Sequence, residues 1–104
     1  LLSFFCNVTA TPEFYALSLH DALPISFETL GCVRVQFKTD SRNIKSQKAI
    51  ERLGAIKEGV LRKHMVLPDG LIRDSIYYSI LDDEWPKVKR HLEKRLFELN
   101  IRDN

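Results

Sequence analysis

Apolar and polar positions alternate or recur at helical spacing along most of the chain after residue 26. From Cys32 to Thr39 the alternation is typical of a half-buried strand. The residues from Asn43 to Leu53 instead repeat at helical spacing, and Gly54 follows as a helix stop. The buried positions expected from these two patterns are Val33, Val35 and Phe37 in the strand and Ser46, Ala49, Ile50 and Leu53 in the helix.

A β-hairpin is the strongest local prediction. Strands are expected over Gly59–Val66 and Leu71–Leu81, on either side of the segment Leu67-Pro68-Asp69-Gly70. Proline presets one turn position, and glycine accepts the positive φ that a tight turn requires. One face of the second strand is expected to carry Ile72, Asp74, Ile76, Tyr78 and Ile80.

A final helix is predicted to follow Asp83, which is a suitable N-cap. Its apolar stripe comprises Trp85, Val88, Leu92, Leu96 and Leu99, whereas Lys87, Arg90 and Lys94 are expected to be exposed. Upstream, Phe27–Gly31 has the pattern of the last turn of a helix with a glycine stop. The elements after residue 26 therefore follow the order β-α-β-β-α, which predicts a mixed α/β (α+β) fold.

Composition limits the kinds of protein that this chain can be. The 104 residues, 44% hydrophobic and 29% charged, suit one small globular domain. A net charge of +2 is too small to indicate a nucleic-acid partner. No apolar run reaches the roughly 20 residues of a membrane span, and the apolar start has no preceding basic residues to make it a signal peptide. Because Cys6 and Cys32 form no CxxC motif and no disulfide framework, a reducing, cytoplasmic setting is expected.

The basic residues are distributed very unevenly. All sixteen lie between Arg34 and Arg102, and none lies between Leu1 and Val33. The first segment is either a buried or edge part of the domain or a piece that does not belong to it. The run from Phe14 to Ser26 resembles translated sequencing-adapter read-through, which favours the second interpretation. We therefore predict a non-native leader over residues 1–26 and a domain over residues 27–104.

The sequence lacks the motifs of several kinds of functional site. His20, His64 and His91 have no cysteine or histidine at ligand spacing, so no metal site is expected. The glycines are isolated, and neither a phosphate-binding loop nor a nucleophile elbow is present. After position 33 the sixteen basic residues outnumber eleven acidic ones, a pattern more typical of a solvated face than of an anion site.

The segment Thr39–Ala55 carries the most specific signal. It contains Asn43, Ser46 and Gly54 at the spacing of the Asn-x-x-Ser/Ala…Gly segment, and in this it resembles the GCN5-related N-acetyltransferases. The branch with the ribosomal-protein-alanine N-acetyltransferases is the closer match. Downstream pieces fit in the same order, and the resemblance runs from about Phe27 to Leu96: Glu58-Gly59, Pro68-Asp69-Gly70, Asp74, Tyr78-Ser79-Ile80-Leu81 and Glu84-Trp85.

The resemblance implies a fold and a reaction. In this family a mixed, mostly antiparallel sheet carries helices on both faces, and acetyl-CoA lies where two neighbouring strands splay apart. Cys32–Thr39 would be the second splayed strand, with Leu71–Leu81 beside the first and Gly59–Val66 at the sheet edge. A substrate amine, such as a protein N-terminus, would attack the thioester directly.

The resemblance also implies two site residues. Asn43 would bind the pantetheine chain, because a carboxamide can both donate and accept hydrogen bonds; alternatively it only caps the helix. Ser46, one turn later, would line the same site and protonate the departing thiolate; alternatively it is a small packing residue. Many relatives place a tyrosine acid seven residues after the asparagine, where this chain has Ile50.

The chain departs from the family pattern before Phe27. Nothing in Leu1–Ser26 matches the pyrophosphate-binding loop, and the strands that supply the usual general base are not found. We therefore expect the C-terminal half of an acetyltransferase behind an unrelated leader, inactive by itself. Two alternatives remain. The first is an inert fragment that associates through its exposed sheet edge. The second is a small RNA-binding module whose basic sheet face, with Tyr77 as its one aromatic residue, comprises Arg34, Lys38, Arg62, Lys63 and Arg73.

Overall fold

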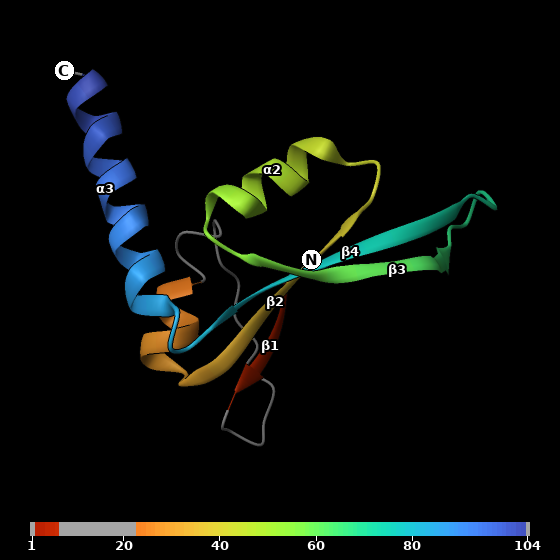
Figure 1. The fold of residues 1–104 in the computed structure, drawn as a ribbon, viewed down its shortest axis with the longest axis horizontal. Helices are drawn as coiled ribbons and strands as arrows, with labels where there is room; N and C mark the ends of the chain where they lie inside the picture. The colour runs from red at the N-terminus through yellow and green to blue at the C-terminus, as the bar shows by residue number, and fades with distance from the viewer. Residues whose placement is uncertain (1, 7–22, 104) are drawn as a thin grey trace. The chain divides into compact units, whose positions relative to one another are not determined.

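The computed structural model describes residues 2–6 and 23–103, and the side chains from 23 to 98. After residue 26 the strands and helices follow the predicted order β-α-β-β-α (Figure 1). The elements along the chain are β1 (Leu2–Cys6), the π-helical turn η1 (Ile25–Thr29), β2 (Cys32–Asp40), α2 (Ile44–Arg52), β3 (Ile56–Val66), β4 (Ile72–Leu81) and α3 (Trp85–Asp103).

The four strands form one sheet in the order β1-β2-β4-β3. β3 pairs antiparallel with β4 and lies at the edge of the sheet, as predicted. The prediction that Leu71–Leu81 lies beside the first splayed strand is wrong, because β4 pairs with β2. The hairpin turn is closed by the N–H of Leu67, which donates to the carbonyl of Leu71 at 2.8 Å, and Gly70 adopts a φ of +84°. β3 begins three residues earlier than the sequence predicts, because Ile56 and Lys57 already pair with Ser79 and Tyr78.

Two compact units make up the chain, and the first contains Gln36–Ile80. In it α2 packs on the hairpin through Ile50 and Leu53, which are buried, and the Tyr78 hydroxyl donates a 2.8 Å hydrogen bond to Glu51 on α2. Figure 1 shows α2 alongside the paired strands β3 and β4. The other buried apolar side chains of this unit are Phe37, Ile76 and Ile80.

Three apolar side chains of these strands and of α2 are exposed. Val33 is 38% exposed because burial at the start of β2 falls on Cys32, and regular alternation begins only at Val35. Ala49 is exposed because the buried side of α2 is narrower than the spacing suggests. Ile72 is 50% exposed because it pairs with Val66 at the end of the hairpin, where both side chains face solvent.

The second unit contains Phe4–Val35 and Leu81–Asn104, of which residues 7–22 and 104 lie outside the described part. Phe27 of η1 stacks on Trp85 with ring centroids 5.3 Å apart. The Lys89 ammonium pairs with the Glu28 carboxylate at 2.7 Å. The buried stripe of α3 consists of Trp85, Val88 and Leu92, and the predicted exposure of Lys87, Arg90 and Lys94 is confirmed.

The two ends of α3 differ from the prediction. The N–H of Val88 donates to the Glu84 carbonyl, so Glu84 and not Asp83 stands immediately before the first turn. Leu96 is 48% exposed and its neighbour Phe97 is 65% exposed, because no described residue covers this part of the helix. The side chain of Leu99 lies outside the described residues.

Most of the predicted leader also lies outside the described residues, so the domain boundary at residue 26 stays a prediction. Leu23 and Ser26, which belong to that leader, are fully buried. Cys32 is buried and disulfide-bonded, a bond that the cysteine spacing did not predict. Among the described residues no helix is both long and apolar enough to cross a membrane.

Candidate functional site

The loop between β2 and α2 is held by an ion pair at its start. The Asp40 carboxylate accepts hydrogen bonds from the Arg42 backbone N–H at 2.9 Å and from its guanidinium at 2.7 and 3.1 Å. These bonds, with Arg42 as the main cause, lower the pKa of Asp40 to about 2. The carboxylate therefore stays ionised and fixes the course of the loop that leads into α2.

Asn43 is the N-cap of α2. Its side-chain Oδ1 accepts from the backbone N–H of Ser46 at 3.0 Å, which satisfies a donor that the helix itself leaves unpaired. The second half of the carboxamide, the Nδ2 donor, bonds to none of the described residues. The cap thus fixes the side chain of Asn43 and leaves an N–H group for a ligand.

Ser46 lies one turn into α2 and is half-buried. Its backbone N–H is used by Asn43, and its hydroxyl forms no hydrogen bond within the described part of the chain. The two predicted site residues are therefore in direct contact. A ligand at this helix end can meet the Asn43 amide and the Ser46 hydroxyl together.

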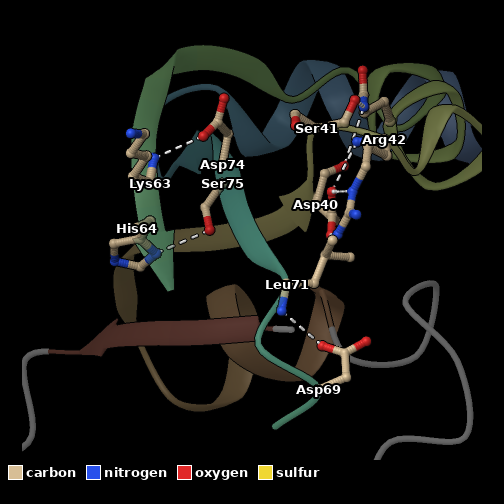
Figure 2. Close-up of polar contacts among 10 residues, drawn as sticks. Asp40, Ser41, Arg42, Lys63, His64, Asp69, Leu71, Asp74 and Ser75 are labelled. Carbon is tan, nitrogen blue, oxygen red and sulfur yellow. Dashed lines mark hydrogen bonds and ion pairs between the residues drawn. The ribbon is translucent and has the colours of Figure 1, made fainter. Parts of the chain in front are cut away.

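Two further contacts join the loop to the rest of the first unit. The Gln47 amide donates to the carbonyls of Ser41 at 2.9 Å and Asp40 at 3.2 Å. The N–H of Ser41 donates to the carbonyl of Asp74 on β4 at 3.0 Å. Figure 2 shows the Asp40–Arg42 pair on one side of β4 and the residues Lys63 and His64 of β3 on the other. The end of α2 that carries Asn43 is consequently fixed to β4.

Sequence reasoning missed a group of polar residues around Asp74. Asp74 accepts from the backbone N–H of Lys63 at 2.7 Å, and Ser75 Oγ lies 2.9 Å from His64 Nδ1. A signal for this group exists, because Asp74 is the one charged residue on a strand face that otherwise carries Ile76, Tyr78 and other apolar side chains. His64, expected to be a surface or packing histidine, lies with its ring edge-on to Tyr77 at 5.8 Å.

The described residues offer no set of ligands for a metal ion. Over the described residues there is no group of three or more histidine, cysteine, aspartate or glutamate side chains that could hold an ion. The acidic side chains near the loop are engaged with donors of the chain itself: Asp40 with Arg42, and Asp69 with the backbone N–H of Leu71 at 3.0 Å. Near the start of α2 the polar groups that bond to no described residue include Asn43 Nδ2 and the Ser46 hydroxyl.

Several solved structures are similar to this chain in sequence and in fold. A protein from T. thermophilus named as an acetyltransferase is 57% identical over 72% of this chain and 40% of its own, with a TM-score of 0.69. A GCN5-related N-acetyltransferase from Brucella melitensis is 37% identical over 67% of this chain and 31% of its own, with a TM-score of 0.64. The spermidine N-acetyltransferase of Vibrio cholerae, 24% identical with a TM-score of 0.61, shares the fold.

The chain has a mixed α/β fold that matches part of an acetyltransferase. The resemblance to the GCN5-related N-acetyltransferases is confirmed by these structures. It spans about 40% of the length of the two structures at 56% and 57% identity. No family model and no curated protein matches it.

Proposed function

We propose that this chain is part of an N-acetyltransferase that transfers the acetyl group of acetyl-CoA to a primary amine. The observation that carries the proposal is the 57% identity over 72% of the chain to a protein named as an acetyltransferase. The geometry at the start of α2 supports it, because Asn43 Nδ2 and the Ser46 hydroxyl both lie at this helix end and neither bonds to a described residue. A protein N-terminus, the acceptor of the ribosomal-protein-alanine branch, is the acceptor we propose.

Acetyl-CoA supplies an activated thioester carbonyl. The amine nitrogen forms a bond to that carbon, the carbon–sulfur bond breaks, and a proton passes from the amine to the thiolate. Asn43 binds the pantetheine chain, donating through Nδ2 while Oδ1 keeps the N-cap. Ser46 acts at the sulfur, where its hydroxyl can donate to the thiolate as charge develops.

These 104 residues contain no match to the family's pyrophosphate-binding loop and no assigned general base. We therefore propose that the chain, taken alone, binds acetyl-CoA weakly and does not turn it over. The cytoplasmic location stays a prediction, and the disulfide at Cys32 gives it no support. Association through the outer edge of β3 also stays a prediction, and an irregularity of that strand at Arg62–His64 opposes continuous pairing there.

The proposal is tested by titrating the ¹⁵N-labelled 104-residue chain with acetyl-CoA and following its backbone amide resonances. We expect the largest saturable shifts at residues 43–47. Absence of saturable shifts anywhere in the chain, or shifts confined to α3, would refute the proposed site.

The role of Ser46 is tested where turnover exists, in a complete acetyltransferase that carries this segment. Ser46→Ala should lower kcat more than it raises KM, because protonation of the thiolate matters only as the carbon–sulfur bond breaks. An equal effect of Ser46→Ala and of Ala49→Ser, a change at an exposed position of the same helix, would show that Ser46 has no chemical role.

A further inference from the structure

The edge strand β3 contains a wide irregularity opposite Asp74. Leu61 pairs with Ser75 and Met65 pairs with Arg73, so three residues of β3, Arg62–His64, face the single residue Asp74 of β4. Lys63 has a φ of +49°, a conformation that is costly for any residue other than glycine. Strain of this kind persists only where the surroundings hold it, and it is concentrated at functional sites.

Side chains of β4 hold the bulge in place. The Asp74 carboxylate accepts from the Lys63 backbone N–H at 2.7 Å, and the Ser75 hydroxyl lies 2.9 Å from Nδ1 of His64 (Figure 2). Tyr77 meets the His64 ring edge-on at an interplanar angle of 76°. The imidazole is thus fixed through Nδ1, and its Nε2 remains for a ligand.

A shallow, open hollow of about 680 Å³ lies along the bulge and is lined by the five consecutive residues Val60–His64. Arg62 and Lys63 are exposed, and neither forms an ion pair with a described residue. Two carboxylates near the hollow accept from backbone N–H groups, Asp74 from Lys63 and Asp69 from Leu71. The residues that line the hollow thus contribute two apolar side chains, Val60 and Leu61, and two positive charges, Arg62 and Lys63.

We propose that this hollow binds an anionic group, a carboxylate or a phosphate, carried by the acceptor of the transfer reaction. Arg62 and Lys63 supply the charge, and His64 donates a hydrogen bond from Nε2 in the tautomer in which the Ser75 hydroxyl donates to Nδ1. The assignment of the ligand as the acceptor rests on the proposed function. The anion site itself does not depend on that function.

The location of the hollow sets the size of the acceptor. The Ser41 N–H donates to the Asp74 carbonyl, so the loop before Asn43 and the bulge flank the same residue of β4. β3 lies two strand spacings from β2, about 10 Å. An extended peptide covers that distance in about three residues. For a protein N-terminus, the anionic group would be an acidic side chain within the first few residues.

The site is tested by titrating the ¹⁵N-labelled 104-residue chain with inorganic phosphate at constant ionic strength. Saturable shifts are expected at the amides of Arg62–His64. The double variant Arg62→Gln/Lys63→Gln should raise the dissociation constant at least fivefold. The matched control Lys48→Gln/Lys57→Gln removes the same charge from exposed positions outside the bulge and should change it less than twofold. Equal weakening by the two double variants, or shifts that sodium chloride reproduces, would overturn the site.

A pair of amines of similar length tests the assignment to the acceptor. ε-Aminocaproate, which carries a carboxylate, should shift the amides of the bulge, whereas hexamethylenediamine, a dication, should not. Equal shifts with both would overturn the preference for an anionic acceptor. Acetyl-CoA serves as the third probe. Displacement of phosphate from the bulge by acetyl-CoA would assign the hollow to the cofactor and overturn the assignment to the acceptor.

The two proposals fail separately. Phosphate shifts at the bulge without acetyl-CoA shifts at residues 43–47 would remove the proposed function and leave the anion site. The reverse result would remove the anion site and leave the proposed function.

Discussion

The hydroxyl of Tyr78 donates a 2.8 Å hydrogen bond to Oε1 of Glu51, and this contact joins strand β4 to helix α2. Tyr78 is 1% exposed, so its phenol has left water and depends on this acceptor. Because Asn43 is the N-cap of α2, the contact helps to hold the candidate site on the sheet.

Tyr78→Phe should lower the free energy of unfolding by about 1–2 kcal/mol, because one hydrogen bond to a carboxylate is lost while the ring stays packed. Urea denaturation measures this change. Tyr77→Phe is the matched control, since the Tyr77 hydroxyl forms no hydrogen bond with a described residue, and it should change stability by less than about 0.5 kcal/mol. Equal effects of the two substitutions would show that the contact with Glu51 contributes nothing.

The same contact predicts a loss of stability at high pH. Burial, and then the hydrogen bond to Glu51, raise the pKa of Tyr78 to about 12 from an ordinary value of 10.0. The unfolded chain therefore releases this proton first, so the contribution of Tyr78 is complete below pH 10 and is lost as the pH rises to about 12. Between these values the urea midpoint of the native chain should fall more steeply than that of Tyr78→Phe. Parallel slopes would contradict the shift.

The Asp40–Arg42 pair predicts the opposite dependence at low pH. The guanidinium and backbone N–H of Arg42 lower the pKa of Asp40 to about 2 from an ordinary 3.8. The stability from this pair is present above pH 3.8 and is lost as the pH falls towards 2. In Arg42→Gln the carboxyl carbon of Asp40 should titrate at a higher pH by NMR, and in Arg90→Gln, an exposed arginine of α3, it should not move.

Leu92 and Leu96 occupy successive turns of α3 but differ in exposure, 6% against 48%. Leu92→Ala should therefore cost about 2–5 kcal/mol of stability, whereas Leu96→Ala should cost less than about 1 kcal/mol. Thermal or urea unfolding of the two variants provides the comparison. A cost below about 0.5 kcal/mol for Leu92→Ala would mean that this face of α3 is not packed.

If residues 1–26 are a non-native leader, removing them should lower the free energy of unfolding by less than about 1 kcal/mol, even though the segment includes strand β1 of the sheet. The described part of that segment supplies a second test, because Leu23 is fully buried. A non-native leader predicts a similarly small effect for Leu23→Ala. A cost of about 2–5 kcal/mol would show instead that Leu23 belongs to the core and that the domain begins before it.

Local patterns predicted the elements of this chain well. The turn at Pro68–Gly70 and the strands beside it follow from residue types that admit few other conformations. The cap at Asn43 was one of two alternatives for this residue, and its position before a helical repeat is visible in the sequence. The other alternative, a site residue, came from the family resemblance and stays a prediction. The errors at Val33, Ala49 and Leu96 share one cause. Periodicity predicts which residues share a face, but residues far away in the sequence decide whether that face is covered.

The bulge at Arg62–His64 could not be predicted in the same way. It depends on a register shift between β3 and β4 and on a bond from Lys63 to Asp74, eleven residues away. A regular alternation of residues predicts a regular strand. Only the pairing with β4 shows that β3 holds two extra residues at this point. Asp74 on an apolar face was the one local sign of it.

The most direct test of the central claim separates the two roles of Asn43. Serine caps helices about as well as asparagine but has no carboxamide N–H, so Asn43→Ser keeps the cap and removes the donor proposed to bind pantetheine. Calorimetric titration of the 104-residue chain with acetyl-CoA should show that Asn43→Ser weakens binding by about 1–3 kcal/mol, or about 5- to 150-fold, with the melting temperature nearly unchanged. Binding of acetyl-CoA to Asn43→Ser with the native affinity would show that Asn43 only caps α2.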